Sequence, residues 1–206
     1  SRRNEAPERA CRPFDAQRDG TVIAEGAAAV VMETLEHALR RGARILAEAV
    51  GYATTEDAYN LVAPDPEGAG ATRAIKLALD DAKMSPSQID YIVAHGTGTP
   101  LNDVTETLAI KKVFGERAYQ IPVSSNKSML GHMLGAAGAI SAIVALLTMR
   151  DGLISPTINL ETPDPQCDLD YVPLRARPAQ VSAALVNAFG FGGQNATFIM
   201  RRYVSS

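Results

Sequence analysis

The sequence contains no tryptophan, and aromatic residues make up only 5% of its 206 residues. Proteins that bind single-stranded nucleic acids stack bases on aromatic side chains, so this composition argues against such a surface. An excess of positive charge is also missing, because 20 Lys and Arg stand against 23 Asp and Glu, for a formal net charge of -3. A globally basic surface is therefore not expected, although the net charge does not exclude a local basic patch. We predict no nucleic-acid partner.

Cysteine is equally scarce. Only Cys11 and Cys167 occur, neither lies in a CxxC motif, and no Cys/His cluster has the spacing of a zinc site. This density rules out a disulfide scaffold, favours a reducing compartment and predicts no metal centre. The first fifteen residues have no apolar core typical of a signal peptide. We therefore expect a cytoplasmic protein.

Long hydrophobic runs are absent as well. The longest uncharged, apolar stretch, Met133 to Met149, has 17 residues and is rich in Ala and Gly. It is short for a membrane span, so we expect a buried helix and no membrane partner. With 46% hydrophobic residues the chain resembles an ordinary globular protein, and a chain of this length should bury roughly 70% of its unfolded surface.

The order of apolar and polar residues predicts strands that alternate with helices. We read residues 1–20 as a loop or connecting segment and residues 22–33 as strand, bend and strand. Further strands are expected over 45–55, 89–94, 121–124, 181–188 and 196–203, and helices over 34–41, 67–83, 102–114 (capped by Asn102) and 133–149. We expect loops over 127–131 and 156–178. This alternation predicts an α/β layered sheet.

Three polar loops follow predicted strands, where α/β sheets usually bind ligands. The first is His95-Gly96-Thr97-Gly98-Thr99-Pro100, an imidazole beside a flexible turn with two hydroxyls. A tight turn with a merely hydrogen-bonded histidine would give the same residues. On this loop alone, a functional and a structural role are equally supported.

The second loop carries Lys127 and His132, with His132 at or just before the apolar helix. The positive end of that helix disfavours imidazolium, so we expect a neutral His132 that can donate to a developing oxyanion. A helix cap is the alternative for His132. For Lys127 alone, a solvated surface lysine is the simpler interpretation.

The third loop, Gly190 to Asn195, holds three glycines that free backbone N–H groups for close approach to a ligand. A hairpin turn would also explain it. Glu106 follows the first loop and could pair with Lys127, although in isolation an exposed helix acid is the simpler interpretation. His37, among charged residues, is read as solvated.

Taken together, HGTGTP, NKSMLGHMLGAAG and FGFGGQNA, in that order, resemble the C-terminal half of a β-ketoacyl-acyl-carrier-protein synthase of the thiolase superfamily. Two further motifs, RPFDAQRDG and PTINLETPDPQCDLDYVP, extend the similarity to essentially the whole chain. The residues of these motifs favour the discrete enzymes of type II fatty-acid synthesis (KAS II-like). The resemblance implies half of a thiolase-like αβαβα layered fold with a mixed sheet. Residues 1–20 would connect to the N-terminal half, and residues 21–206 would form the C-terminal ketosynthase domain.

The resemblance also implies a reaction, a decarboxylative Claisen condensation of an acyl-enzyme with malonyl-ACP in fatty-acid elongation. In this reading His95 and His132 match the two family histidines, whose neutral N–H groups would stabilise the enolate. Lys127 matches a lysine that orders the site, and Glu106 matches its acidic partner. Thr97 and Thr99 match threonines that contact phosphopantetheine. Phe191 matches a gating aromatic residue whose backbone N–H helps form the oxyanion hole.

The same resemblance implies three partners: an acyl carrier protein, a second copy of the protein in a homodimer, and the N-terminal half of the fold. The carrier holds the substrates on its phosphopantetheine, and no other cofactor is expected. Arg2, Arg3 and Arg9 are candidates for carrier docking by charge alone. The chain departs from the family pattern at three places. The nucleophilic cysteine is not in it, Thr21 stands where an aromatic usually follows RDG, and Gln194 replaces a more usual His or Thr. A catalytically silent partner, like a chain-length factor, is therefore the alternative function.

Overall fold

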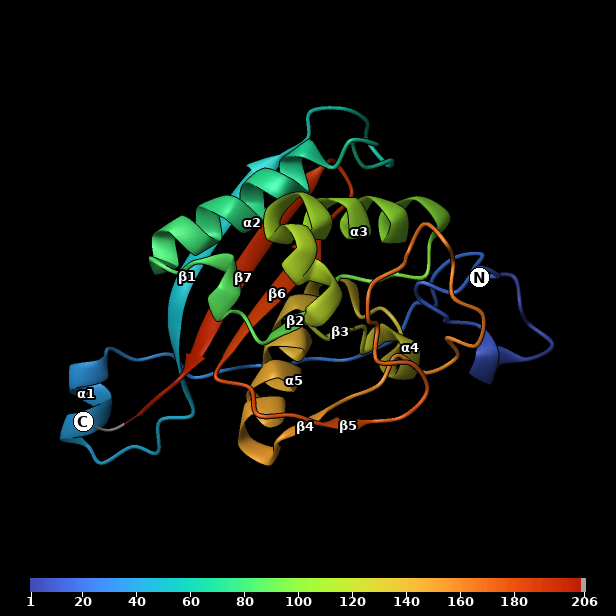
Figure 1. Ribbon diagram of the computed structural model, residues 1–206. Helices are drawn as coiled ribbons and strands as arrows, with labels where there is room; N and C mark the ends of the chain where they lie inside the picture. The colour runs from blue at the N-terminus through green and yellow to red at the C-terminus, as the bar shows by residue number, and fades with distance from the viewer. Residues whose placement is uncertain (205–206) are drawn as a thin grey trace.

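The computed structural model describes residues 1–204 and contains a five-stranded mixed sheet in the order β1-β7-β6-β2-β3 (Figure 1). The strands are β1 (Ala47–Glu56), β2 (Tyr91–Val93), β3 (Val123–Ser124), β6 (Ala183–Phe189) and β7 (Gln194–Arg202). β1, β7 and β6 pair antiparallel, whereas β6, β2 and β3 pair parallel. β4 (Leu153–Ile154) and β5 (Arg177–Pro178) form a separate small ribbon.

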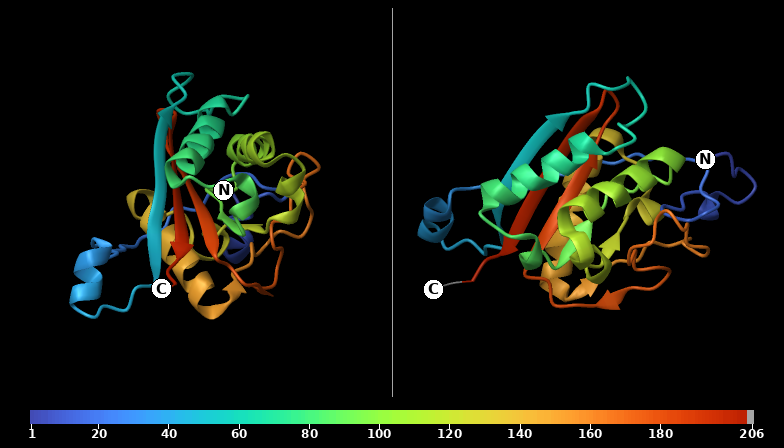
Figure 2. Two further views of the ribbon diagram at one scale, coloured as in Figure 1. Left: turned by 60° about the vertical axis from the view of Figure 1, so that its left-hand side comes forward. Right: turned by 45° about the horizontal axis from the view of Figure 1, so that its top comes forward.

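Helices cover both faces of this sheet. The α-helices are α1 (Leu35–Arg40), α2 (Ala69–Ala82), α3 (Pro100–Phe114), α4 (Lys127–Leu130) and α5 (Ala137–Asp151). Single 3-10 turns span Pro7–Arg9, Pro86–Gln88, Gly115–Gln120 and Leu134–Ala136. α2 and α3 lie side by side over one face (Figures 1 and 2). The predicted α/β class and the mixed sheet are confirmed.

Two apolar cores follow from the alternation of side chains along the strands. Ile92, Leu185 and Ile199 point into the larger core, which α2 and α3 close. Their neighbours Val93 and Val186 point the other way, into a core with buried residues of α5. The central strands β2 and β6 are thus covered on both faces, as their continuous apolar sequence predicts.

α5 packs less completely than its sequence predicts. Together with the preceding turn it forms an 18-residue stretch, Leu134–Asp151, with a mean hydropathy of 1.4, long and apolar enough to cross a membrane by length and composition alone. Only 33% of these residues are buried. Ala142, Ala145 and Met149 pack on the sheet, while most of the remaining helix surface is half-buried. The expectation of a fully buried helix is therefore met on one side only.

The predicted strands over 22–33 are wrong for this chain. The segment is extended, and its only β-pairing with the described residues is a single bridge between Ile23 and His132. A strand needs a neighbouring backbone for its N–H and C=O groups, and the described residues offer none beyond that bridge. Val31 and Met32 are consequently 86% and 68% exposed. Figures 1 and 2 show α1, which follows this segment, standing away from the sheet.

Two smaller predictions also need correction. Asn102 does not cap α3, because the helix begins two residues earlier at Pro100 with Thr99 in the N-cap position. Proline is favoured in the first turn of a helix because it has no N–H to leave unpaired. The expected loop over 127–131 begins with the one-turn helix α4, which ends at Gly131 with a positive φ of 73°.

Candidate functional site

The three predicted loops meet at one end of the sheet and line a cavity of about 680 Å³. His95 follows β2, His132 follows α4, and Phe191 lies in the turn between β6 and β7. Thr97, Thr99 and Glu106 from the first loop and α3 also line the cavity, together with Thr21. Of the predicted site residues, only Lys127 lies behind the wall rather than in it.

His95 is buried at the base of the cavity. Its ring centroid lies 5.5 Å from that of His132, with the two rings nearly perpendicular at 83°, and 5.5 Å from that of Phe189. Burial, reinforced by the nearby charge of Lys127, holds the pKa of His95 well below its usual range. The Nδ1 atom is buried and has no hydrogen-bond partner in the described part of the chain, residues 1–204. The imidazole is therefore neutral at physiological pH.

His132 is fixed through both its backbone and its ring. Its N–H donates to the carbonyl of Val22 at 2.7 Å, and its Nδ1 accepts from the N–H of Leu134 at 3.1 Å. An accepting Nδ1 assigns the single proton of the neutral ring to Nε2, which makes Nε2 a donor. Burial and the charge of Lys127 lower the pKa of His132 to about 4.

The neutral state of His132 was predicted correctly, but for the wrong reason. α5 begins only at Ala137, five residues beyond His132, with a 3-10 turn between them. The effect of a helix terminus fades within its first turn. Burial and Lys127 depress the pKa instead.

Lys127 is 2% exposed, which overturns the surface-lysine interpretation. Its Nζ donates to the carbonyl oxygen of His95 at 2.6 Å. Burial lowers the pKa of Lys127 to about 8, although the negative charge of Glu106 opposes that shift. The ammonium thus holds the backbone of one histidine and adds to burial in lowering the pKa of both imidazoles.

Glu106 is fully buried, so the exposed-acid interpretation is also wrong. Its Oε1 accepts from the N–H of His95 and its Oε2 from the N–H of Gly96, each at 2.8 Å. Burial raises the pKa of Glu106, against the effect of these donors. The expected direct pair with Lys127 is not formed, since no ion pair joins the two among residues 1–204. The two residues instead hold the backbone of His95 from opposite ends.

Sequence reasoning missed two residues that complete this arrangement. Asn187 donates its Nδ2 to Glu106 Oε1 at 3.0 Å and accepts from Thr197 Oγ1 at 3.0 Å. It is the only polar residue in the apolar run 183–189, and a lone amide in a buried strand is the signal that could have found it. Phe189, at the end of the same run, packs beside His95 and lines the cavity.

The hydroxyls of Thr97 and Thr99 hydrogen-bond to each other at 2.8 Å at the cavity wall. Arg18 and Asp103 fix the backbone of the turn that carries Thr97 and Thr99. Arg18 donates its Nε to the carbonyl of Thr99 at 3.2 Å, and Asp103 Oδ1 accepts from the N–H of Gly98 at 3.2 Å. The predicted contact turn is therefore preorganised.

Phe191 is 76% exposed at the mouth of the cavity. Its neighbours Gly192 and Gly193 both have a φ of 89°, which side chains other than glycine rarely adopt. Gln194 begins β7 directly after them and is exposed. The turn thus presents an accessible aromatic ring at the mouth.

Neither cysteine lines the cavity. Burial raises the pKa of Cys11 and of Cys167 to about 11 each. A nucleophilic cysteine needs a lowered pKa, because the thiolate is the reactive form. Both thiols are therefore unsuited to nucleophilic catalysis.

The other sequence candidates lie outside the cavity. Arg9 forms an ion pair with Glu161, and Arg3 donates to the carbonyl of Gln17 at 2.8 Å. Arg2 is exposed near the N-terminus. His37 is exposed on α1, with its Nδ1 3.2 Å from Glu33, as its charged surroundings predicted.

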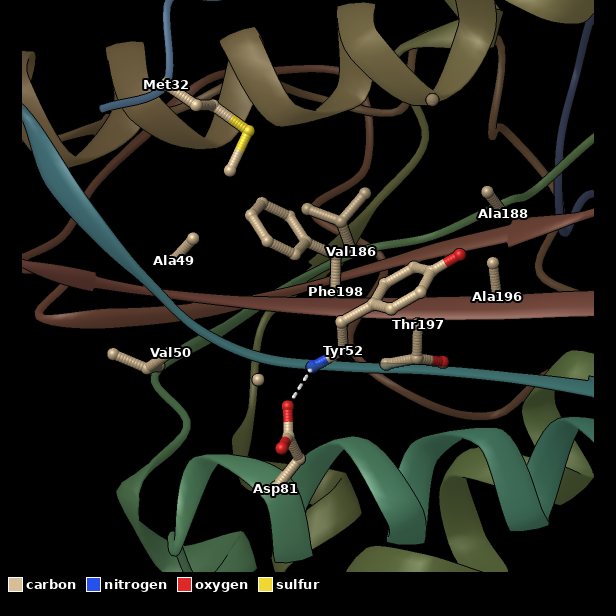
Figure 3. A pocket seen from close by; sticks show the side chains of 12 residues that line it. Met32, Ala49, Val50, Tyr52, Asp81, Val186, Ala188, Ala196, Thr197 and Phe198 are labelled. Carbon is tan, nitrogen blue, oxygen red and sulfur yellow. Dashed lines mark hydrogen bonds between the residues drawn. The ribbon is translucent and has the colours of Figure 1, made fainter. Parts of the chain in front are cut away.

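A second cavity of about 540 Å³ lies against β1 and β7 and contains none of the predicted site residues. Figure 3 shows Met32 above the apolar side chains of Val186 and Phe198, with Tyr52 beside them. On the α2 side, Asp81 accepts from the N–H of Tyr52 at 3.0 Å (Figure 3). This hollow is mainly apolar and has no acid–base residue besides Asp81 and Tyr52.

Comparison with known families gives two matches. "Beta-ketoacyl synthase, C-terminal domain" matches residues 46–161, and "Beta-ketoacyl synthase, N-terminal domain" matches residues 1–38. Curated relatives named "3-oxoacyl-[acyl-carrier-protein] synthase 2" are 54% identical over 201 residues in Synechocystis sp. and 52% identical over 202 residues in Coxiella burnetii. These alignments cover 98% of this chain but only 48% and 49% of the relatives. The chain therefore spans about half the length of the curated relatives it matches.

Solved structures agree with these matches. A ketosynthase described in complex with its type II polyketide acyl-carrier protein superimposes with a TM-score of 0.96 at 44% identity, over 99% of this chain and 50% of that chain. A beta-ketoacyl synthase from Burkholderia phymatum gives a TM-score of 0.94 at 44% identity, over 99% of this chain and 49% of that chain. The thiolase-like ketosynthase fold is thus shown for this chain.

Proposed function

Because this chain belongs to the beta-ketoacyl synthase family, we propose that the full-length protein is a 3-oxoacyl-ACP synthase of fatty-acid elongation. The chain supplies the half of the active site that carries two histidines and a lysine. The observation that carries this proposal is the pair of neutral imidazoles, His95 and His132, with ring centroids 5.5 Å apart at one cavity. In this proposal residues 1–20 connect to the N-terminal half and residues 21–206 form the C-terminal ketosynthase domain.

The reaction follows from the chemistry of the two imidazoles. In malonyl-ACP, the bond between the α-carbon and the carboxylate breaks, carbon dioxide leaves, and the electron pair forms an enolate. Neutral N–H donors on His95 and His132 stabilise the enolate oxygen without donating a full proton. The enolate carbon then attacks an acyl thioester on a cysteine elsewhere in the full-length protein. Cleavage of that thioester releases the cysteine thiolate and gives 3-oxoacyl-ACP, the carbon dioxide having already left in the first step.

Lys127 and Glu106 are positioning residues in this scheme. Lys127 holds the carbonyl of His95, and Glu106 holds its N–H. The positive charge of Lys127 also disfavours imidazolium at both histidines, which keeps them as donors rather than acids. Their burial next to the histidines supports this role.

The remaining site residues bind and admit substrate. Thr97 and Thr99, which line the cavity, would contact the phosphopantetheine arm of the acyl carrier protein. Phe191, at the mouth of the cavity, would gate entry and contribute its N–H to an oxyanion hole for the acyl thioester. An acyl-carrier-protein partner belongs to the same proposal and is supported by the ketosynthase–carrier complex to which the fold is similar. A homodimer and a cytoplasmic location complete the proposal.

The alternative is a catalytically silent partner that controls chain length. Thr21, which stands where the family usually has an aromatic residue, is the departure within this chain that favours it. The missing cysteine does not distinguish the two functions, because the chain spans only about half the length of its relatives. The enzyme is the better-supported reading, because the histidines and Lys127 are held by hydrogen bonds that a silent subunit does not require.

The decisive experiment measures carbon dioxide release from malonyl-ACP by the full-length protein. Removing one donor from an oxyanion site typically costs about 10²–10³-fold in rate, which is the loss expected for His95→Ala or His132→Ala. Lys127→Ala should also lose most activity, whereas His37→Ala, an exposed histidine on α1, is the matched control. Retained decarboxylation in both site variants would refute the assignment, and an inactive wild-type protein would favour the silent partner.

A further inference from the structure

Thr21 is held between the two loops that carry the histidines. On one side, the N–H of Gly20 donates to the carbonyl of Gly98 at 3.0 Å. On the other, the carbonyl of Val22 accepts from the N–H of His132 at 2.7 Å. With both neighbours fixed by backbone hydrogen bonds, Thr21 has a defined place in the cavity wall between His95 and His132.

The hydroxyl of Thr21 has no hydrogen-bond partner among residues 1–204. Its Oγ1 is buried and makes no hydrogen bond to any of them, and the same holds for Nδ1 of His95 in the same wall. By contrast, the hydroxyls of Thr97 and Thr99 satisfy each other. A buried, unpaired hydroxyl costs stability unless a ligand supplies its partner.

The charges around the cavity restrict what that ligand group can be. Among the described residues, no lysine or arginine lines the cavity, and its acidic residues are Asp57 and Glu106. Within this half of the site, a carboxylate beside Thr21 therefore meets neutral donors. This suits decarboxylation, because a cation would stabilise the charge that must leave the carboxylate as carbon dioxide forms.

We propose that the hydroxyl of Thr21 donates a hydrogen bond to the carboxylate of the malonyl group and so selects the carboxylated extender substrate. This inference rests on the proposed function and adds a specificity residue to it. In the step, the α-carbon–carboxylate bond breaks, its electron pair moves to the α-carbon and the thioester oxygen, and neutral carbon dioxide leaves Thr21. The hydrogen bond is strongest to the ground-state carboxylate and weakens as that charge disappears.

This difference predicts a distinctive kinetic pattern. An interaction stronger in the ground state than in the transition state lowers both KM and kcat, so that its removal raises KM and does not lower kcat. Thr21→Val, which keeps the shape and removes the hydroxyl, should raise KM for malonyl-ACP about ten-fold, as expected for a hydrogen bond to a charged group, and should not lower kcat. Histidine variants should instead lower kcat.

The test uses the full-length protein and separates two half-reactions. Steady-state decarboxylation of malonyl-ACP gives KM and kcat, and mass spectrometry follows acylation of the protein by acyl-ACP, a substrate without the carboxylate. Thr21→Val should change only the first, Thr21→Ser should restore KM, and Thr54→Val on an exposed position of β1 is the matched control.

Each outcome decides the matter. A KM within two-fold of wild type in Thr21→Val, a lower kcat at unchanged KM, or an equal loss in acylation would overturn the proposal. If the wild-type protein releases no carbon dioxide at all, the proposed function fails first, and that result is distinct from a failure at Thr21.

Discussion

The burial of Glu106 leads to a quantitative prediction for Glu106→Gln. In the structure three donors point at this carboxylate: the N–H groups of His95 and Gly96 and the amide of Asn187. All three donors are buried, and the carboxylate accepts every one of them. Glutamine keeps one oxygen but replaces the other with an NH₂ group that faces a donor.

The expected cost follows from the number of donors left without an acceptor. An unsatisfied buried donor costs about 1–3 kcal/mol, so Glu106→Gln should lower the free energy of unfolding by about that amount. Loss of the buried charge offsets part of this cost, because burial disfavours an ionised carboxylate. Glu106→Ala, which removes both oxygens, should destabilise more than Glu106→Gln.

The same substitution should change the pH dependence of decarboxylation. The negative charge of Glu106 raises the pKa of Lys127, which stands at about 8. Without that charge, Lys127 loses its proton at lower pH. The basic limb of the activity profile should therefore move to lower pH in Glu106→Gln.

Urea unfolding of the full-length protein and a pH profile of carbon dioxide release measure these two effects. Glu33→Gln, at an acid near the exposed helix α1, serves as the control. Wild-type stability together with an unshifted basic limb would refute the role assigned to Glu106.

Three further predictions follow. Because His132 has a folded pKa of about 4, below its usual value of 6.5, the unfolded state binds more protons between these values. Its stabilising contribution should be complete above pH 6.5 and fall away toward pH 4, which unfolding at a series of pH values measures. Gly70→Ala should lower the free energy of unfolding by about 1–3 kcal/mol, since a methyl group there would lie 2.6 Å from Asn195 Nδ2. Gly135→Ala is the control, because its methyl group meets no atom within 4 Å and should leave the free energy of unfolding unchanged. Denaturant unfolding measures both variants. Cys11 and Cys167, each with a pKa of about 11, should resist iodoacetamide at pH 7.5 in the folded protein, and rapid alkylation detected by mass would contradict their burial.

The sequence by itself determined most of the secondary structure. β1, α2, β2, β6 and β7 lie where their apolar patterns predict, because these patterns record which side of each element faces the core. It also placed His95, Thr97 and Phe191 in loops after strands. The roles assigned to these residues stay predictions.

Pairing and burial were decided only by the tertiary structure. Residues 22–33 have a strand-like sequence but stay extended, because a strand forms only with a neighbouring backbone. Lys127 and Glu106 read as surface residues in isolation, yet they are buried around one histidine. Charged side chains enter a core only where distant residues supply hydrogen-bond partners, and those partners are brought within reach by folding rather than by sequence neighbours.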